Sequence, residues 1–175
     1  MSKKDILSHL QGGDRRSLGR ADRVVAAVIE DPKLFPQLIA GLWSSDPLVC
    51  MRAADAAEKV TREHPKLLQP YKRELLGLMA EAQQQELRWH LAAMVPRLVL
   101  SARERKAAIS SLHTYLEDRS SIVKTFALQG LADFAREEPG IRSSVIETLR
   151  QATRTGTSAM KARSRKLLSR LGRIR

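Results

Sequence analysis

One twelve-residue pattern recurs four times along the chain, at steps of about 37 residues. Every copy has an apolar residue at its first, ninth and twelfth positions, and three of the four have a basic residue at the second. Positions 1, 5, 8, 9 and 12 share one face of an α-helix, so each copy predicts a helix with one buried face. Self-similarity at this period predicts an array of helical repeats. The four copies are residues 49–60 (VCMRAADAAEKV), 87–98 (LRWHLAAMVPRL), 123–134 (VKTFALQGLADF) and 160–171 (MKARSRKLLSRL).

The segments between the copies have helical patterns of their own, separated by turn and capping signals. Asp46 followed by Pro47 predicts a helix start just before the first copy, and Ser101 with Glu104 has the spacing of a capping box. We therefore expect one all-α domain over residues 1–175, with ten helices in five antiparallel pairs and no β-strand. The first pair, with helices expected over residues 3 to 10 and residues 15 to 29, is expected to be an atypical N-terminal cap. The five pairs are residues 1–30, 31–63, 66–100, 101–137 and 139–173.

The repeated pattern resembles that of HEAT repeats. In that family the second helix of each pair carries V-R-x-x-A-a-x-a-L-x-x-L after a turn that contains Asp. Residues 87–98 and 123–134 match this pattern closely, and residues 49–60 match it apart from Cys50 and Ala57. The resemblance implies a right-handed α-solenoid whose second helices line a concave side. It also implies an interaction scaffold.

The same resemblance implies acid–base pairs between neighbouring repeats, made by the Asp of the turn and the basic residue at position 2. The third pair departs from this arrangement because its turn has Gln84 in place of Asp. The last copy departs further, with Ser164 and Arg165 where small residues are usual. The residues available for these pairs are Asp46, Asp118, Arg88, Lys124 and Lys161.

The charge balance is the strongest compositional signal about partners. The formal net charge is +12, and after residue 141 the chain has a single acidic residue, Glu147. This excess favours an anionic partner, either an acidic protein or peptide or a nucleic acid. The alternative is that the charge only keeps an alanine-rich array soluble, with the basic C-terminal helix as a polar cap. These interpretations are compatible.

Candidate binding residues follow from the repeat register. If positions 1, 5, 9 and 12 are buried, positions 3, 7, 11 and 14 form an exposed stripe on each inner helix. Basic residues dominate this stripe and could follow a phosphate backbone, with Trp89 available for stacking. The alternative is that these are solvated helix faces and that Trp89 is partly buried. We call the selected binding residues the candidate ladder. It includes Arg163, a residue of the basic C-terminal helix that lies outside the exposed stripe. The members are Lys59, Arg62, Trp89, Arg97, Arg136, Arg163, Lys166, Arg170 and Arg173.

Catalysis has little support in the sequence. The four histidines are scattered, without a metal-ligand spacing, and there is no glycine-rich phosphate loop or nucleophile elbow. We therefore expect a non-enzymatic protein without metal or cofactor. Some DNA-repair glycosylases resemble HEAT arrays, so Trp89 with Asp133 or Asp55 leaves a DNA glycosylase as a minor alternative. Trp43 is expected in the core.

The sequence lacks both a signal peptide and a run of eighteen apolar residues. We expect a cytoplasmic protein that does not bind membranes, and the oligomeric state stays open. The first hypothesis is a scaffold or adaptor that binds an acidic protein or peptide through its concave face and basic C-terminal helix. The second is a protein that binds the nucleic-acid backbone.

The repeat register predicts the effect of one core substitution. Ala127 takes the small position 5 of its copy, so Ala127→Leu should overpack the helix pair and lower the free energy of unfolding by about 1–3 kcal/mol. Urea denaturation measures this change. An unaltered midpoint would show that the register is wrong.

Overall fold

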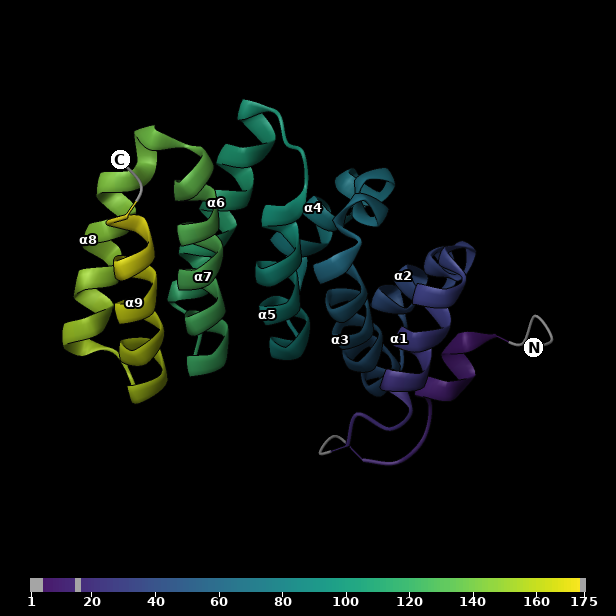
Figure 1. Cartoon of the computed structure of the whole chain (residues 1–175). Coiled ribbons are helices and arrows are strands. Elements are labelled where there is room, and N and C mark those ends of the chain that lie inside the picture. The colour runs from purple at the N-terminus through teal and green to yellow at the C-terminus, as the bar shows by residue number, and fades with distance from the viewer. Residues whose placement is uncertain (1–4, 15–16, 174–175) are drawn as a thin grey trace. The chain divides into compact units, whose positions relative to one another are not determined.

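The computed structural model describes residues 5–14 and 17–173. Within these two stretches every regular element is a helix, with nine α-helices, five 3-10 segments and no strand, which confirms the all-α class. The chain divides into two compact units, Met1–Lys72 and Arg73–Arg175. Figure 1 shows the elements of each unit. The interpretation of residues 1–175 as one repeat domain stays a prediction.

The first unit is organised around one helix, α3 (Pro47–Glu63). Asp46 caps this helix by accepting a hydrogen bond from the backbone N–H of Leu48, as the sequence predicts. Five shorter elements pack against α3, and α3 is buried along most of its length because they surround it. The other elements of the unit are η1 (Ile6–Leu10), α1 (Ala21–Glu30), η2 (Pro32–Leu34), α2 (Phe35–Ala40), η3 (Gly41–Trp43) and η4 (Pro65–Tyr71).

Arg52 of α3 is the largest fully buried side chain in the first unit, with 1% of its surface exposed. Its guanidinium donates four hydrogen bonds to backbone carbonyls of the chain that precedes α1. Buried arginine requires such acceptors, because its N–H groups would otherwise lose their hydration without compensation. The acceptors are the oxygens of Leu10 at 2.7 Å, Gly12 at 2.6 Å, Asp14 at 2.9 Å and Ser17 at 3.1 Å.

This arrangement corrects the expected start of the chain. A helix was predicted from residue 3 to residue 10, and its described part is the short segment η1, which is of the 3-10 type. The next helix, α1, begins at Ala21 rather than at residue 15. Residues 3, 4, 15 and 16 lie outside the described residues. Gly12 and Gly19 have φ angles of +72° and +58°, a left-handed backbone conformation that interrupts a helix. The described residues therefore hold nine α-helices where ten were expected.

Trp43 is a second correction, because 48% of its surface is exposed although we expected it in the core. The expectation assumed one continuous α-helix through residues 32–43. Instead, α2 ends at Ala40 and the chain continues as the 3-10 segment η3. A 3-10 helix has three residues per turn, so the apolar stripe no longer meets Trp43.

The second unit is organised around α7 (Ser121–Glu137), which packs against four helices. In Figure 1, α5, α7 and α9 lie side by side, and the packing of α7 against both neighbours agrees with this view. Ser101 and Glu104 form the predicted capping box. The other elements are α4 (Lys72–Glu81), α5 (Gln85–Met94), η5 (Val95–Arg97), α6 (Ala102–Leu116), α8 (Pro139–Thr155) and α9 (Ser158–Leu171).

One of the acid–base pairs implied by the family resemblance is present within this unit. Arg88, at position 2 of its copy, forms an ion pair with Asp118 in the turn before α7. Burial alone would raise the pKa of Asp118, but the Ser120 N–H and the Arg88 guanidinium outweigh it and leave the pKa lowered. Arg88 also lies over the ring of Tyr115, whose hydroxyl donates to the Met79 carbonyl at 2.7 Å. The pair therefore joins α5 to the α6–α7 turn.

The register of the repeated pattern agrees with the burial of the inner helices. Positions 1, 5, 8, 9 and 12 are buried in α3, α5 with η5, and α7. In α9 the same positions are buried or partly buried. No helix among the described residues has the length and apolar character that crossing a membrane requires.

Close helix packing at Gly130 generates a test of the second unit. A Cβ atom at Gly130 would lie 2.8 Å from the backbone oxygen of Ala92, whereas one at Gly77 in α4 would have no atom within 4 Å. Gly130→Ala should therefore lower the free energy of unfolding by about 1–3 kcal/mol, although alanine favours helix. Gly77→Ala should raise it by about 0.5–1 kcal/mol. Urea denaturation of both variants checks this, and stabilisation by both would contradict the close approach of α7 to α5.

Candidate anion-binding site

Three residues of the candidate ladder line one cavity of about 400 Å³ in the second unit. They are Arg136 near the end of α7, Arg170 in the last turn of α9, and Arg173, which follows α9 after Gly172. The two helices pack together, so these arginines reach the same cavity. We refer to this cavity as the arginine pocket. Its lining residues are Gln129, Ala132, Asp133, Arg136, Leu167, Arg170, Leu171 and Arg173.

Asp133 is the acidic residue of the arginine pocket and lies partly buried on α7. Burial raises its pKa, and this effect prevails over a hydrogen bond from Gln129 and over the charges of Arg136, Arg97 and Arg170. Among the described residues, no ion pair within 4 Å joins Asp133 to these arginines. The arginines thus act on Asp133 through their charges at distances beyond 4 Å, and no salt bridge in the described part of the chain holds their guanidinium groups to its carboxylate.

Gln129 holds the Asp133 carboxylate from the same helix. Its Nε2 donates to Asp133 Oδ1 at 2.9 Å, and its Oε1 accepts from Arg163 Nη1 at 2.8 Å. The guanidinium of Arg163 also lies 5.8 Å from the ring centroid of Phe126, where a cation is attracted to the ring face. Arg163 therefore binds within the protein, between α9 and α7, rather than facing a partner.

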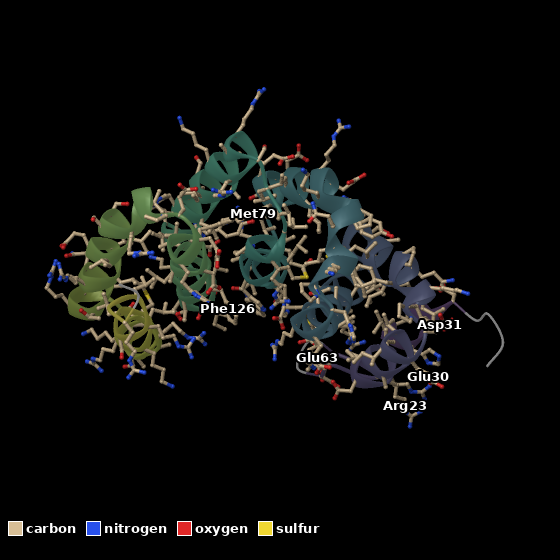
Figure 2. All side chains as sticks on the ribbon, turned by 45° about the horizontal axis from the view of Figure 1, so that its top comes forward. Arg23, Glu30, Asp31, Glu63, Met79 and Phe126 are labelled. Atoms are coloured by element: carbon tan, nitrogen blue, oxygen red, sulfur yellow. The ribbon has the colours of Figure 1, made fainter. Side chains whose placement is uncertain are left out.

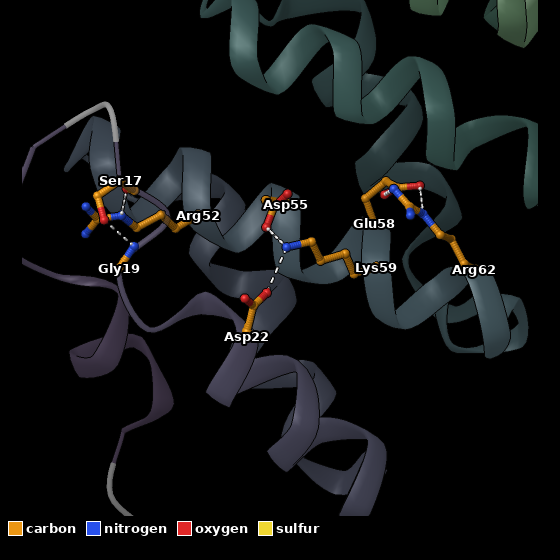
Figure 3. A network of polar contacts seen from close by, with 8 residues as sticks. All are labelled: Ser17, Gly19, Asp22, Arg52, Asp55, Glu58, Lys59 and Arg62. Atoms are coloured by element: carbon orange, nitrogen blue, oxygen red, sulfur yellow. Dashed lines mark hydrogen bonds and ion pairs between the residues drawn. The ribbon is translucent and has the colours of Figure 1, made fainter.

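Two other residues of the candidate ladder, both in the first unit, have their charges balanced locally. Lys59 Nζ lies 2.9 Å from a carboxylate oxygen of Asp22 and 2.9 Å from one of Asp55 (Figure 3). Burial lowers the pKa of Lys59, but the two carboxylates together raise it above its ordinary value. Arg62 binds the carboxylate of Glu58 through both Nε and Nη2 (Figure 3). Neither cation contributes much net charge to a binding face.

The remaining ladder residues lie apart from the arginine pocket's lining. Lys166 is exposed on α9, and Arg97 is partly exposed in η5. Trp89 is partly exposed, with its ring tilted by 55° against His90 at a centroid distance of 5.5 Å. Three residues expected on the exposed stripe are instead buried, because neighbouring elements cover more than one face of these helices; they are Met51, Leu100 and Thr125.

A larger cavity of about 870 Å³ in the second unit was missed by the sequence analysis. It lies where the end of α6, the start of α7, the second half of α8 and the start of α9 meet. Leu128 and Ala152 are its buried apolar residues. Its rim is rich in hydroxyl groups, which have no distinctive pattern in the sequence; the hydroxyl-bearing residues are Ser121, Ser144, Thr148, Thr155 and Thr157.

Comparisons with known proteins do not identify a family. No family profile matches the chain, and no curated protein sequence matches it significantly. In the part of the chain that the structure describes, no three His, Cys, Asp or Glu side chains are placed to hold a metal ion.

The raised pKa of Asp133 predicts how stability depends on pH. The folded chain holds the Asp133 proton more tightly than the unfolded chain does, so stability falls as the pH rises from the unfolded to the folded pKa. At pH 7 the ionised carboxylate is therefore destabilising. Asp133→Asn, which still accepts from Gln129, should raise the urea midpoint at pH 7 and leave it unchanged near pH 3. A lower midpoint at pH 7 would mean that attraction to the arginines outweighs burial.

Proposed function

We propose that this chain is a non-enzymatic, HEAT-like α-solenoid scaffold that binds an acidic protein or peptide through the inner helices of its second unit. The sequence period supports an array of five helix pairs, the first of them an atypical cap. The resemblance to HEAT repeats implies that the array is right-handed. Within the second unit, the buried faces of α5 and α7 and the Arg88–Asp118 pair support HEAT-like packing.

The arginine pocket is the observation that carries the binding proposal. Arg136, Arg170 and Arg173 line one cavity in which Asp133 is the one acidic residue among the described lining residues. Guanidinium groups bind carboxylates through paired, charge-assisted hydrogen bonds. An acidic side chain that entered the pocket would balance charge that Asp133 leaves uncompensated.

The distribution of cations favours a peptide over a nucleic-acid backbone. A backbone needs cations at successive positions along its path, and the candidate ladder does not provide them. Lys59 and Arg62 are paired with acids, and Arg163 binds Gln129 and Phe126. Of the remaining ladder cations, Arg136, Arg170 and Arg173 line one cavity, which suits a discrete acidic group.

A nucleic-acid ligand is the second candidate, and one observation favours it. The last helix carries several exposed basic residues, and Figure 2 shows nitrogen-tipped side chains extending from its yellow ribbon. Such a helix binds polyanions by releasing counterions, with little sequence preference. Trp89 would then stack on a base of a single strand.

Fluorescence anisotropy over a salt titration separates the two candidates. The probes are a polyglutamate peptide and labelled single- and double-stranded DNA. We expect tighter binding of polyglutamate, weakened about tenfold or more when Lys166 and Arg170 are both changed to Glu. The matched control reverses Arg103 and Lys106, two exposed cations on α6.

Each other outcome has a definite meaning. Tight binding of DNA alone, with a loss of about 1–3 kcal/mol for Trp89→Ala on single strands, would favour the nucleic-acid candidate. Equal losses for both charge reversals would show that only net charge matters. Unchanged affinity for every probe after reversal of Lys166 and Arg170 would refute both candidates.

A further inference from the structure

The charge of the arginine pocket specifies the partner more closely than acidity alone. Three lining arginines face one lining carboxylate, which leaves two positive charges in excess. The C-terminal ends of α7 and α9 add a partial negative charge that falls off within their last turns. The lining side chains therefore carry an excess of two formal positive charges, and a single carboxylate would balance only half of it.

The number of donors around the pocket also suits a phosphate group. Each guanidinium presents a planar fork of N–H groups that fits two phosphate oxygens at once. Arg136 lines the pocket from α7, Arg170 lines it from the last turn of α9, and Arg173 lines it from the residues that follow α9. Donors from two helices can thus bind different oxygens of one tetrahedral group. A planar carboxylate has only two oxygens to share among three arginines.

We infer that the arginine pocket binds a phosphate monoester on the partner, as in a phosphorylated serine or threonine within an acidic peptide. This inference rests on the proposed function, because it names the group that the same site recognises. A monoester carries a charge of about −1.5 to −2 at pH 7 and has three strong acceptor oxygens. Each diester of a nucleic-acid backbone carries only one negative charge. A single cavity of about 400 Å³ also suits the end of one side chain better than a run of diesters.

Asp133 sets the selectivity of the pocket in this arrangement. Its carboxylate repels any anion that enters, so only a ligand with enough charge and donor contacts binds well. Gln129 fixes the carboxylate from the same helix by its 2.9 Å hydrogen bond. Replacing Asp133 by Asn keeps this bond's acceptor and removes the repulsion. The substitution should therefore strengthen phosphate binding, whereas a purely structural role for Asp133 would give no such gain.

The test uses the full chain and three fluorescein-labelled peptides that differ at one position. Each has glutamate and glycine around a central serine, phosphoserine or glutamate. We expect the phosphoserine peptide to bind about tenfold or more tightly than the other two. Arg170→Gln should abolish this preference, and Asp133→Asn should increase affinity for the phosphoserine peptide about threefold or more. Arg165→Gln, an exposed α9 variant outside the pocket lining, should leave the preference unchanged.

The outcomes distinguish this inference from the function on which it rests. Equal binding of phosphoserine and glutamate peptides, weakened by Arg170→Gln in both cases, would refute the phosphate inference and support the acidic-peptide proposal. No binding of any peptide by the unaltered chain would refute both. Stronger competition by a 5′-phosphorylated oligonucleotide than by the phosphoserine peptide would refute the inference that the phosphate group belongs to a peptide. Thermal melting of each variant verifies that a loss of binding is not a loss of folding.

Discussion

The close approach of α5 and α7 is the constraint on which the second unit depends. Gly130 faces the Ala92 backbone, and Ala127, one turn earlier, is fully buried. Small residues at these positions let α7 contact four helices, because a larger side chain on either surface would separate the axes. The arginine pocket depends on the position of α7, since the second half of α7 and the end of α9 supply most of its lining residues. A shift of α7 would move Asp133 and Arg136 together.

The sequence predicted the parts of the fold that depend on local pattern. The buried positions of the inner helices, the Asp46 cap and the Ser101 capping box all follow from spacing along one helix. The start of the chain could not be predicted in the same way. Arg52 appeared as one basic residue among small apolar ones, and its acceptors lie 35 to 42 residues earlier in the chain.

The candidate site was predictable only as a set of basic residues on inner helices. Which cations retain their charge depends on partners that are distant in sequence. Lys59 meets Asp22, 37 residues earlier, and Arg163 meets Gln129, 34 residues earlier. No spacing rule along a helix could reveal these pairs. The presence of Arg136, Arg170 and Arg173 around the same cavity as Asp133 likewise required the packing of α7 against α9.

Arg52 has a consequence for the order in which the protein can fold during translation. The carbonyl of Leu10 leaves the ribosome well before the guanidinium that binds it, because 42 residues separate the two. Domains usually fold from the N-terminus as they are synthesised. Here the first segment of the chain cannot complete its hydrogen bonds until α3 has been made. The native conformation of residues 5–14 is therefore acquired late in the synthesis of this unit, and nascent chains that stop before Arg52 lack it.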